Sequence, residues 1–205
     1  MSVRKGEPWG TVGPVPEGLV VVRTGTELAH LVNRCRAADR PLPPVGLLGG
    51  DLCHALGGTG DESRFAGEVP ILPVDLLRVE VGGRTVWAAA HVIARRWRGW
   101  RGQVVAVMNG QYAGRADVAP RAHPGDGQAD VVSVDGAMDA RARWQAYRRL
   151  PTGTHVPHGS ITARRARQLT VELTAALPVA ADGRRIARAR TFTVTVEPGA
   201  LTVCV

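Results

Sequence analysis

The chain has 205 residues, 44% of them hydrophobic, so it is long enough and apolar enough to fold around a buried core. Lysine and arginine outnumber aspartate and glutamate by 26 to 18, and the net charge of +8 favours anionic partners. No apolar run approaches the roughly 20 residues needed to cross a bilayer, and the N-terminus lacks the apolar stretch of a signal peptide. We therefore expect a cytoplasmic protein. Three widely spaced cysteines without a CxxC pair predict buried free thiols rather than disulfides or a zinc site.

The first 75 residues read as an α/β unit. A Gly- and Pro-rich lead-in, residues 1–17, is expected to be irregular. Short β-branched runs then alternate with helical spacing of apolar side chains, which predicts β–α–β–α order with parallel strands. The predicted strands are Gly18–Arg23 and Val45–Leu48, and the predicted helices are Glu27–Ala38 and Asp51–Leu56.

The character of the sequence changes near Asp75. Strand-like segments follow one another, separated by Gly-Gly, Asn-Gly and Asp-Gly turns, which is typical of an antiparallel sandwich or barrel. The clearest helix is Ala137–Leu150, with an Arg-rich face. We therefore predict an α+β protein of two layers, with domains at 1–75 and 76–205. The predicted strands are Leu76–Val81, Thr85–Ile93, Gln103–Met108, Asp130–Val134, Thr170–Leu173, Thr191–Val196 and Leu201–Val205.

Several motifs in the second half carry a family resemblance. Asn109-Gly-Gln-Tyr-Ala-Gly114 is followed by Ala119-Pro-Arg-Ala122, Asp126-Gly127 and Asp130-Val-Val132. Order and spacing are similar to NGxYxGGG and APxAxxxDGxLDVV of the bacterial diacylglycerol and sphingosine kinase-like lipid kinases. Ala181-Asp-Gly183 resembles the family's DGE turn, and Val196–Val203 resembles its closing strand pair.

The first half matches the same family less closely. Val20–Thr26 stands where the family has a hydrophobic strand and GGDGT, and Gly46–Gly57 resembles LPLGTxNDFAxxLG with residues deleted. A rival alignment places Gly49-Gly50-Asp51 on GGDGT. The resemblance implies an ATP-binding α/β domain, shortened at its start, packed on a lipid-binding β-sandwich with the active site between them. It also implies ATP and Mg²⁺ as cofactors.

The resemblance assigns roles to particular residues. Asp182 and Asp51 are the candidate catalytic carboxylates. A structural role competes with each: Asp182-Gly183 suits a type I′ hairpin turn, and Asp51 suits a helix N-cap. Asn109-Gly110 likewise suits a hairpin turn. The nucleotide is expected at Gly25, Thr26, Gly49 and Gly50, and an anion or substrate at Arg23, Arg184 and Asn109.

The motifs also depart from the family pattern. Val22-Arg23-Thr24 replaces Gly-Gly-Asp, and Arg184 replaces the Glu of DGE, so permissive glycines and carboxylates are lost. Losing one general base typically costs ~10²–10⁴ in rate. The sequence therefore predicts degenerate kinase activity. Two alternatives are a repurposed enzyme that uses the old cleft for acid/base chemistry, and a non-catalytic binding or partner protein.

Partners follow from charge and composition. A lipid or small-molecule ligand is expected, with a possible homo-oligomer. The segment 95–101 interleaves arginine and tryptophan, which suits nucleic acid bound by stacking and charge, an anionic membrane surface, or a solvated loop. No pattern specific for nucleic acid is present. His155 and His158 have no evident third ligand, so no metal site is predicted.

Overall fold

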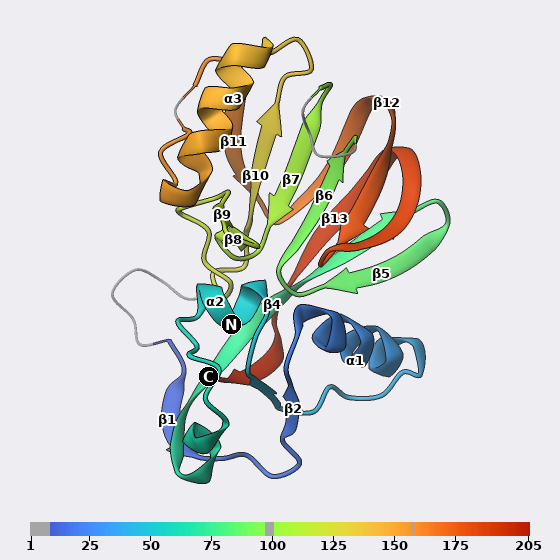
Figure 1. Cartoon of the computed structure of the whole chain (residues 1–205). Helices are drawn as coiled ribbons and strands as arrows, with labels where there is room; N and C mark the ends of the chain where they lie inside the picture. Colours follow the sequence, from blue (N-terminus) through green and yellow to red (C-terminus); the bar gives the residue numbers. More distant parts are fainter. Residues whose placement is uncertain (1–8, 97–100, 157) are drawn as a thin grey trace.

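The structure is a computed structural model that describes residues 9–96, 101–156 and 158–205. A small α/β unit holds α1, α2 and the short strands, and the long strands rise from it into a larger β body that carries α3 at its far side (Figure 1). The predicted α+β architecture is confirmed. The first part comprises β1 (Thr11–Pro14), β2 (Val20–Val22), α1 (Gly25–Ala37), β3 (Val45–Leu47), α2 (Asp51–Ala55) and the 3₁₀ turn Glu62–Ala66.

One segment of the lead-in forms a strand, contrary to the prediction of irregular structure. Thr11–Pro14 forms β1 and pairs antiparallel with β4 (Glu68–Val81), with Thr11 opposite Ile71. Gly and Pro disfavour strands locally, but an edge strand tolerates Pro because its outward N–H needs no partner. The pairing partner lies 60 residues away in sequence, so local composition carries no signal of it.

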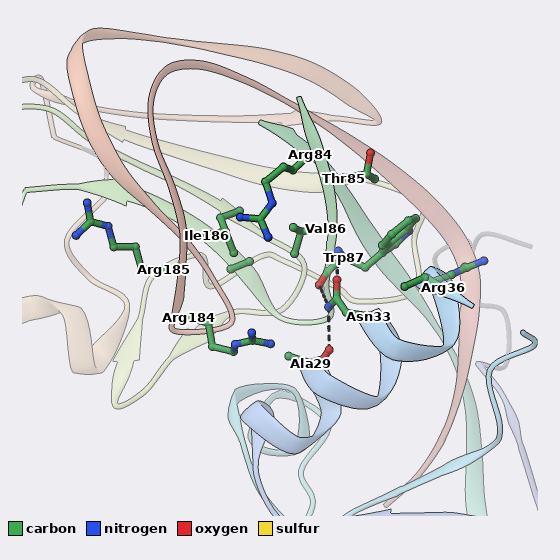
Figure 2. A pocket seen from close by; sticks show the side chains of 12 residues that line it. Ala29, Asn33, Arg36, Arg84, Thr85, Val86, Trp87, Arg184, Arg185 and Ile186 are labelled. Carbon is green, nitrogen blue, oxygen red and sulfur yellow. Dashed lines mark hydrogen bonds between the residues drawn. The ribbon is translucent and has the colours of Figure 1, made fainter. Parts of the chain in front are cut away.

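Helix α1 starts and packs as its sequence dictates. Thr24 is the N-cap, since its side-chain oxygen accepts from the Glu27 N–H at 3.1 Å. Leu28, Leu31 and Val32 are buried, as the helical spacing predicted. Asn33 then anchors the helix to β5 (Arg84–Ala88): its amide donates to the Trp87 carbonyl at 2.8 Å and accepts from the Trp87 N–H at 3.0 Å (Figure 2).

The chain's last strand completes the sheet of the α/β unit. β2 pairs in parallel with β3, as predicted, and β3 pairs in parallel with the end of β13 (Arg184–Cys204). Val203 therefore packs in the same apolar cluster as Val32 and Leu47. The proposed boundary at residue 75 falls within β4, which runs through both parts. That boundary stays a prediction.

Eleven strands of the described residues form one continuous sheet, which bends so that its faces enclose the upper core (Figure 1). Along its main path the order is β1-β4-β13-β12-β6-β7-β10-β11, with every neighbouring pair antiparallel. Helix α3 (Ala140–Arg149) packs beside β10 and β11. The remaining elements are β6 (His91–Arg95), β7 (Val104–Met108), β8 (Tyr112–Ala113), β9 (Ala116–Asp117), β10 (Ala129–Val134), the 3₁₀ turn Leu150–Thr152, β11 (Ile161–Ala166) and β12 (Gln168–Ala181).

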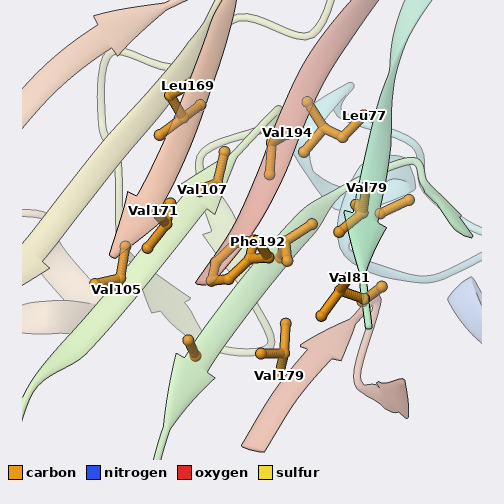
Figure 3. Close-up of a cluster of buried hydrophobic side chains, with 14 of the residues drawn as sticks. Leu77, Val79, Val81, Val105, Val107, Leu169, Val171, Val179, Phe192 and Val194 are labelled. Carbon is orange, nitrogen blue, oxygen red and sulfur yellow. The ribbon is translucent and has the colours of Figure 1, made fainter. Parts of the chain in front are cut away.

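The upper core is built from alternate residues of facing strands (Figure 3). Phe192 and Val194 of β13 meet Val79 of β4 and Val107 of β7, and all four are at most 2% exposed. Burial of one such side chain contributes about 1.5–3 kcal/mol. This alternation confirms the predicted antiparallel character of the second half.

Several predicted strands have different bounds in the structure. The predicted strand Thr85–Ile93 is in fact β5 and β6, separated by a turn at Ala89-Ala90. The predicted strands Thr191–Val196 and Leu201–Val205 are parts of one strand, β13, with a register shift between Glu197 and Leu201. β11 was missed, because its four central positions are exposed and it lacks the apolar run that marked the others.

Cys35, Cys53 and Cys204 are buried free thiols, as predicted. Among the described residues, the helices are too short and too polar to cross a bilayer.

Candidate functional site

The three predicted nucleotide-binding glycines lie together: Gly25 begins α1, and Gly49 and Gly50 lie between β3 and α2. Gly50 has φ +92°, and a Cβ on it would come within 2.6 Å of the Gly25 nitrogen. A Cβ on Gly49 would collide with the Arg23 carbonyl oxygen. Any larger residue would push apart the two turns. These glycines are therefore required for the close approach of the turns, whether or not a ligand binds there.

A small cavity lies at this junction. Five of the predicted site residues line it: Gly25, Gly49, Gly50, Asp51 and Asp182. The fold thus brings the candidate catalytic carboxylates together with the candidate nucleotide-binding glycines, although Asp182 is far from the others in sequence. The cavity volume is about 30 Å³. That is room for a water molecule or two, and far less than a triphosphate occupies.

Asp182 binds backbone groups of the neighbouring strand connection. Its carboxylate accepts from the N–H groups of Ala89 at 2.7 Å, Ala90 at 2.9 Å and His91 at 3.0 Å. These three bonds hold the turn that separates β5 from β6. Asp182 and Gly183 have φ of +46° and +77°, the conformation that a type I′ hairpin requires. The residue therefore serves both as a turn residue and as an acceptor for another turn.

Asp51 joins α2 to the β body. It is the first residue of α2, and Gly50 occupies the N-cap position. One carboxylate oxygen lies 2.8 Å from His91 Nε2, and the other accepts from the Gly114 N–H at 2.9 Å. Burial raises the pKa of Asp51, but the His91 hydrogen bond and charge and the Gly114 N–H outweigh it, so the pKa lies below the usual value.

Asn109 contacts the turn between β5 and β6 and is fully buried. Its amide donates to the carbonyls of Asp75 at 2.8 Å and Ala89 at 2.7 Å. Asp75 in turn accepts from the N–H groups of Gly127 at 2.7 Å and Gly199 at 2.8 Å, the latter at the bulge of β13. Burial raises the pKa of Asp75. This buried polar network ties β4, β5, β13 and the 124–127 loop together.

The two arginines predicted to bind an anion lie in different places. Arg23 is exposed and pairs with Glu62 at 2.8 Å. Arg184 lines a larger pocket on the outer side of α1 (Figure 2). Thr26 lies in the first turn of α1, one residue after Gly25. The structure therefore does not bring Arg23 and Arg184 to one site.

ATP and Mg²⁺ do not fit the residues at this junction. Mg²⁺ needs oxygen ligands at about 2.0–2.1 Å in octahedral geometry. All four carboxylate oxygens of Asp51 and Asp182 already accept short hydrogen bonds or contact His91. Among the described residues, no cluster of three metal-ligating side chains occurs, and the cavity is too small for phosphates. We derive no chemistry through either group.

A second cavity, of about 440 Å³, lies between α3 and the outer face of β6, β7 and β10. Its lining is mainly apolar, including the buried side chains of Ala106, Val132, Met138 and Ile161. Exposed Arg95 and Arg115 also line it. The sequence analysis missed this site. The available signal was the repeat of Ala142, Ala146 and Leu150 at every fourth position, through α3 and the 3₁₀ turn that follows it.

His155 lies at this second cavity and is 5% exposed. One ring nitrogen, Nε2, lies 3.1 Å from the Val118 carbonyl oxygen. Burial lowers the pKa of His155, against the smaller opposing effects of Val118 and Asp117. A neutral imidazole therefore suits this wall. Of the tryptophan-arginine segment predicted to contact membranes, residues 97–100 lie outside the described residues.

Comparison with known proteins gives a family and a fold. Residues 75–205 match the model of the YegS C-terminal NAD kinase beta sandwich-like domain. A comparison with curated protein sequences gives no match. Solved structures from Bacillus anthracis strain Sterne that are assigned as diacylglycerol kinases share the fold. One has a TM-score of 0.68 at 14% identity, over 90% of this chain and 77% of that one. A second has a TM-score of 0.65 at 17% identity, over 90% and 76%.

Proposed function

Because the chain belongs to the family of the YegS C-terminal NAD kinase beta sandwich-like domain, and is thus diacylglycerol kinase-like, we propose that it is a lipid-binding protein with degenerate kinase activity. The observation that carries the proposal is the contrast between its cavities. The apolar pocket beside α3 has about 440 Å³, within the range of small-molecule sites. The junction that would hold the triphosphate has about 30 Å³.

The chemistry of the apolar pocket favours an amphiphilic ligand. Its floor is formed by side chains of β7 and β10, which offer dispersion contacts but no hydrogen bonds. Arg95 and Arg115 supply exposed cations at the same pocket. A ligand with an apolar tail and a polar or anionic headgroup would satisfy both parts. This is the combination that a membrane lipid presents.

Helix α3 carries exposed aromatic side chains that suit contact with a membrane, from which such a ligand would come. Trp144 and Tyr147 are 49% and 57% exposed, on the helix that covers the pocket. The guanidinium of Arg148 lies 4.8 Å from the centre of the Trp144 ring. Exposed aromatic rings beside arginines suit an anionic membrane interface. Peripheral membrane contact is therefore part of the proposal, whereas a cytoplasmic location and a homo-oligomer stay predictions.

The lipid-binding proposal can be tested by placing a larger side chain of α3 in the pocket. Ala146 lines the cavity, so Ala146→Trp should occupy the space and weaken binding of a fluorescent diacylglycerol by more than about tenfold, a loss of more than about 1.4 kcal/mol. Gln145→Trp places the same side chain at the exposed neighbouring position and should leave binding unchanged. Equal loss in both variants would contradict a site beside α3. Magnesium-dependent phosphorylation of the lipid at ordinary kinase rates would contradict the degenerate activity.

The Asp51–His91 pair is the observation that could favour acid/base chemistry. A carboxylate 2.8 Å from an imidazole is the arrangement that orients a general base. However, His91 is 5% exposed, and its other ring nitrogen, Nδ1, is enclosed without a hydrogen-bond partner. His91 lines none of the three cavities described for this chain. The pair therefore favours a structural role over the repurposed enzyme.

A further inference from the structure

A third cavity in the described part of the chain belongs to neither of the sites above. It has a volume of about 490 Å³ and lies between the outer face of α1 and two hairpins, the β4–β5 turn and the β12–β13 turn (Figure 2). α1 contributes Asn33 and Arg36. The hairpins contribute Arg84, Trp87 and Arg184. It shares none of its lining residues with the small cavity that holds Asp51 and Asp182.

The charged side chains that line this pocket are all cationic. Four of its lining residues are arginines and none is an aspartate or glutamate. Arg36 is paired with Glu197 at 2.8 Å. Arg84, Arg184 and Arg185 have no carboxylate within 4.0 Å among the described residues. Figure 2 shows Arg84 and Arg184 reaching into the space from different hairpins, while Arg185 extends away from it.

Its walls are fixed by hydrogen bonds. Asn33 uses its whole amide on the helix and on β5, donating to the carbonyls of Ala29 and Trp87 and accepting from the Trp87 N–H. The Trp87 indole N–H donates to Glu197 at 3.1 Å, and the Arg36 guanidinium lies 5.8 Å from the ring centre. The wall formed by α1 and β5 is therefore fixed before a ligand binds, which lowers the ordering cost of binding.

We propose that this pocket is a binding site for a compact ligand with two phosphate groups, held between Arg84 and Arg184. Guanidinium groups bind phosphate oxygens through two parallel N–H donors, and such charge-assisted bonds are among the strongest in proteins. Two arginines that reach in from separate hairpins match two anionic groups better than one. Val86 and Ile186 leave apolar surface beside them for an organic substituent. The site goes beyond the proposed lipid pocket and does not depend on it.

The test measures binding of inorganic pyrophosphate to the full chain by titration calorimetry at constant ionic strength and without metal. Arg84→Gln and Arg184→Gln should each weaken binding by at least about tenfold, because each removes a charge-assisted fork. Arg188→Gln is the matched control: Arg188 is exposed on β13 and does not line the pocket. It should change the affinity less than about twofold. Orthophosphate should bind more weakly than pyrophosphate.

Other results would overturn the site. Failure of pyrophosphate to bind would rule the site out. An equal loss of affinity in all three variants would show only a general attraction of anions to a basic surface. Equal affinities for orthophosphate and pyrophosphate would contradict the proposal that the site recognises two phosphate groups. Dihexanoyl phosphatidic acid, below its micellar concentration, distinguishes a lipid source: binding that needs Arg84 and Arg184 and exceeds that of pyrophosphate would assign the anion to a lipid. Ala146→Trp should leave pyrophosphate binding intact, so this site and the lipid pocket can fail separately.

Discussion

The junction at Asp51 and Asp182 and the pocket beside α3 use their side chains in opposite ways. At the junction, both carboxylates bind backbone N–H groups or His91, and little space is left between them. Beside α3, apolar side chains line an open space of about 440 Å³. The comparison teaches that two carboxylates in candidate catalytic positions can act as acceptors that hold the fold together. Each prediction below tests one side of this contrast.

The largest expected effect concerns Asp182. Replacing it with Ala leaves three backbone N–H groups without their acceptor. Ala also tolerates the backbone angle φ +46° at this position less well than Asp does. We expect Asp182→Ala to lower the free energy of unfolding by about 3 kcal/mol, measured by urea denaturation. Asp182→Asn should lose less, because Asn keeps an acceptor oxygen and tolerates this conformation. An Ala variant within about 1 kcal/mol of the parent would contradict the structural role.

An intermediate effect is expected for Asp51, and it should depend on pH. Because the folded state lowers the pKa of Asp51 below 3.8, the carboxylate stabilises the fold above that pH. The stabilisation is lost as the pH falls through the folded-state pKa. Asp51→Asn should therefore cost about 2 kcal/mol at pH 7, from weakened bonds to His91 and Gly114, and much less near pH 2.

The measurement is urea denaturation of the parent and of Asp51→Asn at several pH values from 2 to 7. Asp61→Asn serves as a control, since Asp61 is an exposed N-cap whose pKa is also lowered, by its hydrogen bond with Ser63, and it does not line the junction cavity. A difference between parent and Asp51→Asn that stays constant across this range would show that the charge of Asp51 does not stabilise the junction.

The smallest expected effect tests the α3 pocket. Burial lowers the pKa of His155 below 6.5, so the folded state binds this proton less readily than the unfolded chain does. The contribution of His155 to stability should be complete above pH 6.5 and decrease as the pH falls below it, by about 1 kcal/mol or less. His155→Gln should remove that decrease in denaturation curves between pH 5 and 8. An unchanged slope in the variant would mean that His155 is not the group responsible.

The strands, helices and family were accessible from the sequence where the signal is local. The spacing of Leu28, Leu31 and Val32 gave α1, and the Asp182-Gly183 pair gave a hairpin turn. β1 was missed because its only support is pairing with β4, far along the chain. The break in the predicted strand Thr85–Ile93 was missed for a similar reason, since the turn at Ala89-Ala90 is held by the distant carboxylate of Asp182.

The candidate site residues divide in the same way, between those with a local sequence signal and those that depend on distant contacts. The motifs led to Gly25, Gly49, Gly50, Asp51 and Asp182, and the fold does place these five around one cavity. Their catalytic and cofactor roles stay predictions. Neither the pocket beside α3 nor the convergence of Arg84 with Arg184 could be read from sequence, because each joins segments separated by many residues.

The sequence by itself determined the α+β class, the family and the turn-rich order of the second half, since apolar spacing and turn chemistry act between near neighbours. Only the tertiary structure decided how much space lies between the elements and which polar groups already have partners. Cavity volume and hydrogen-bond saturation depend on contacts between residues such as Asp182 and Ala89, which are 93 positions apart.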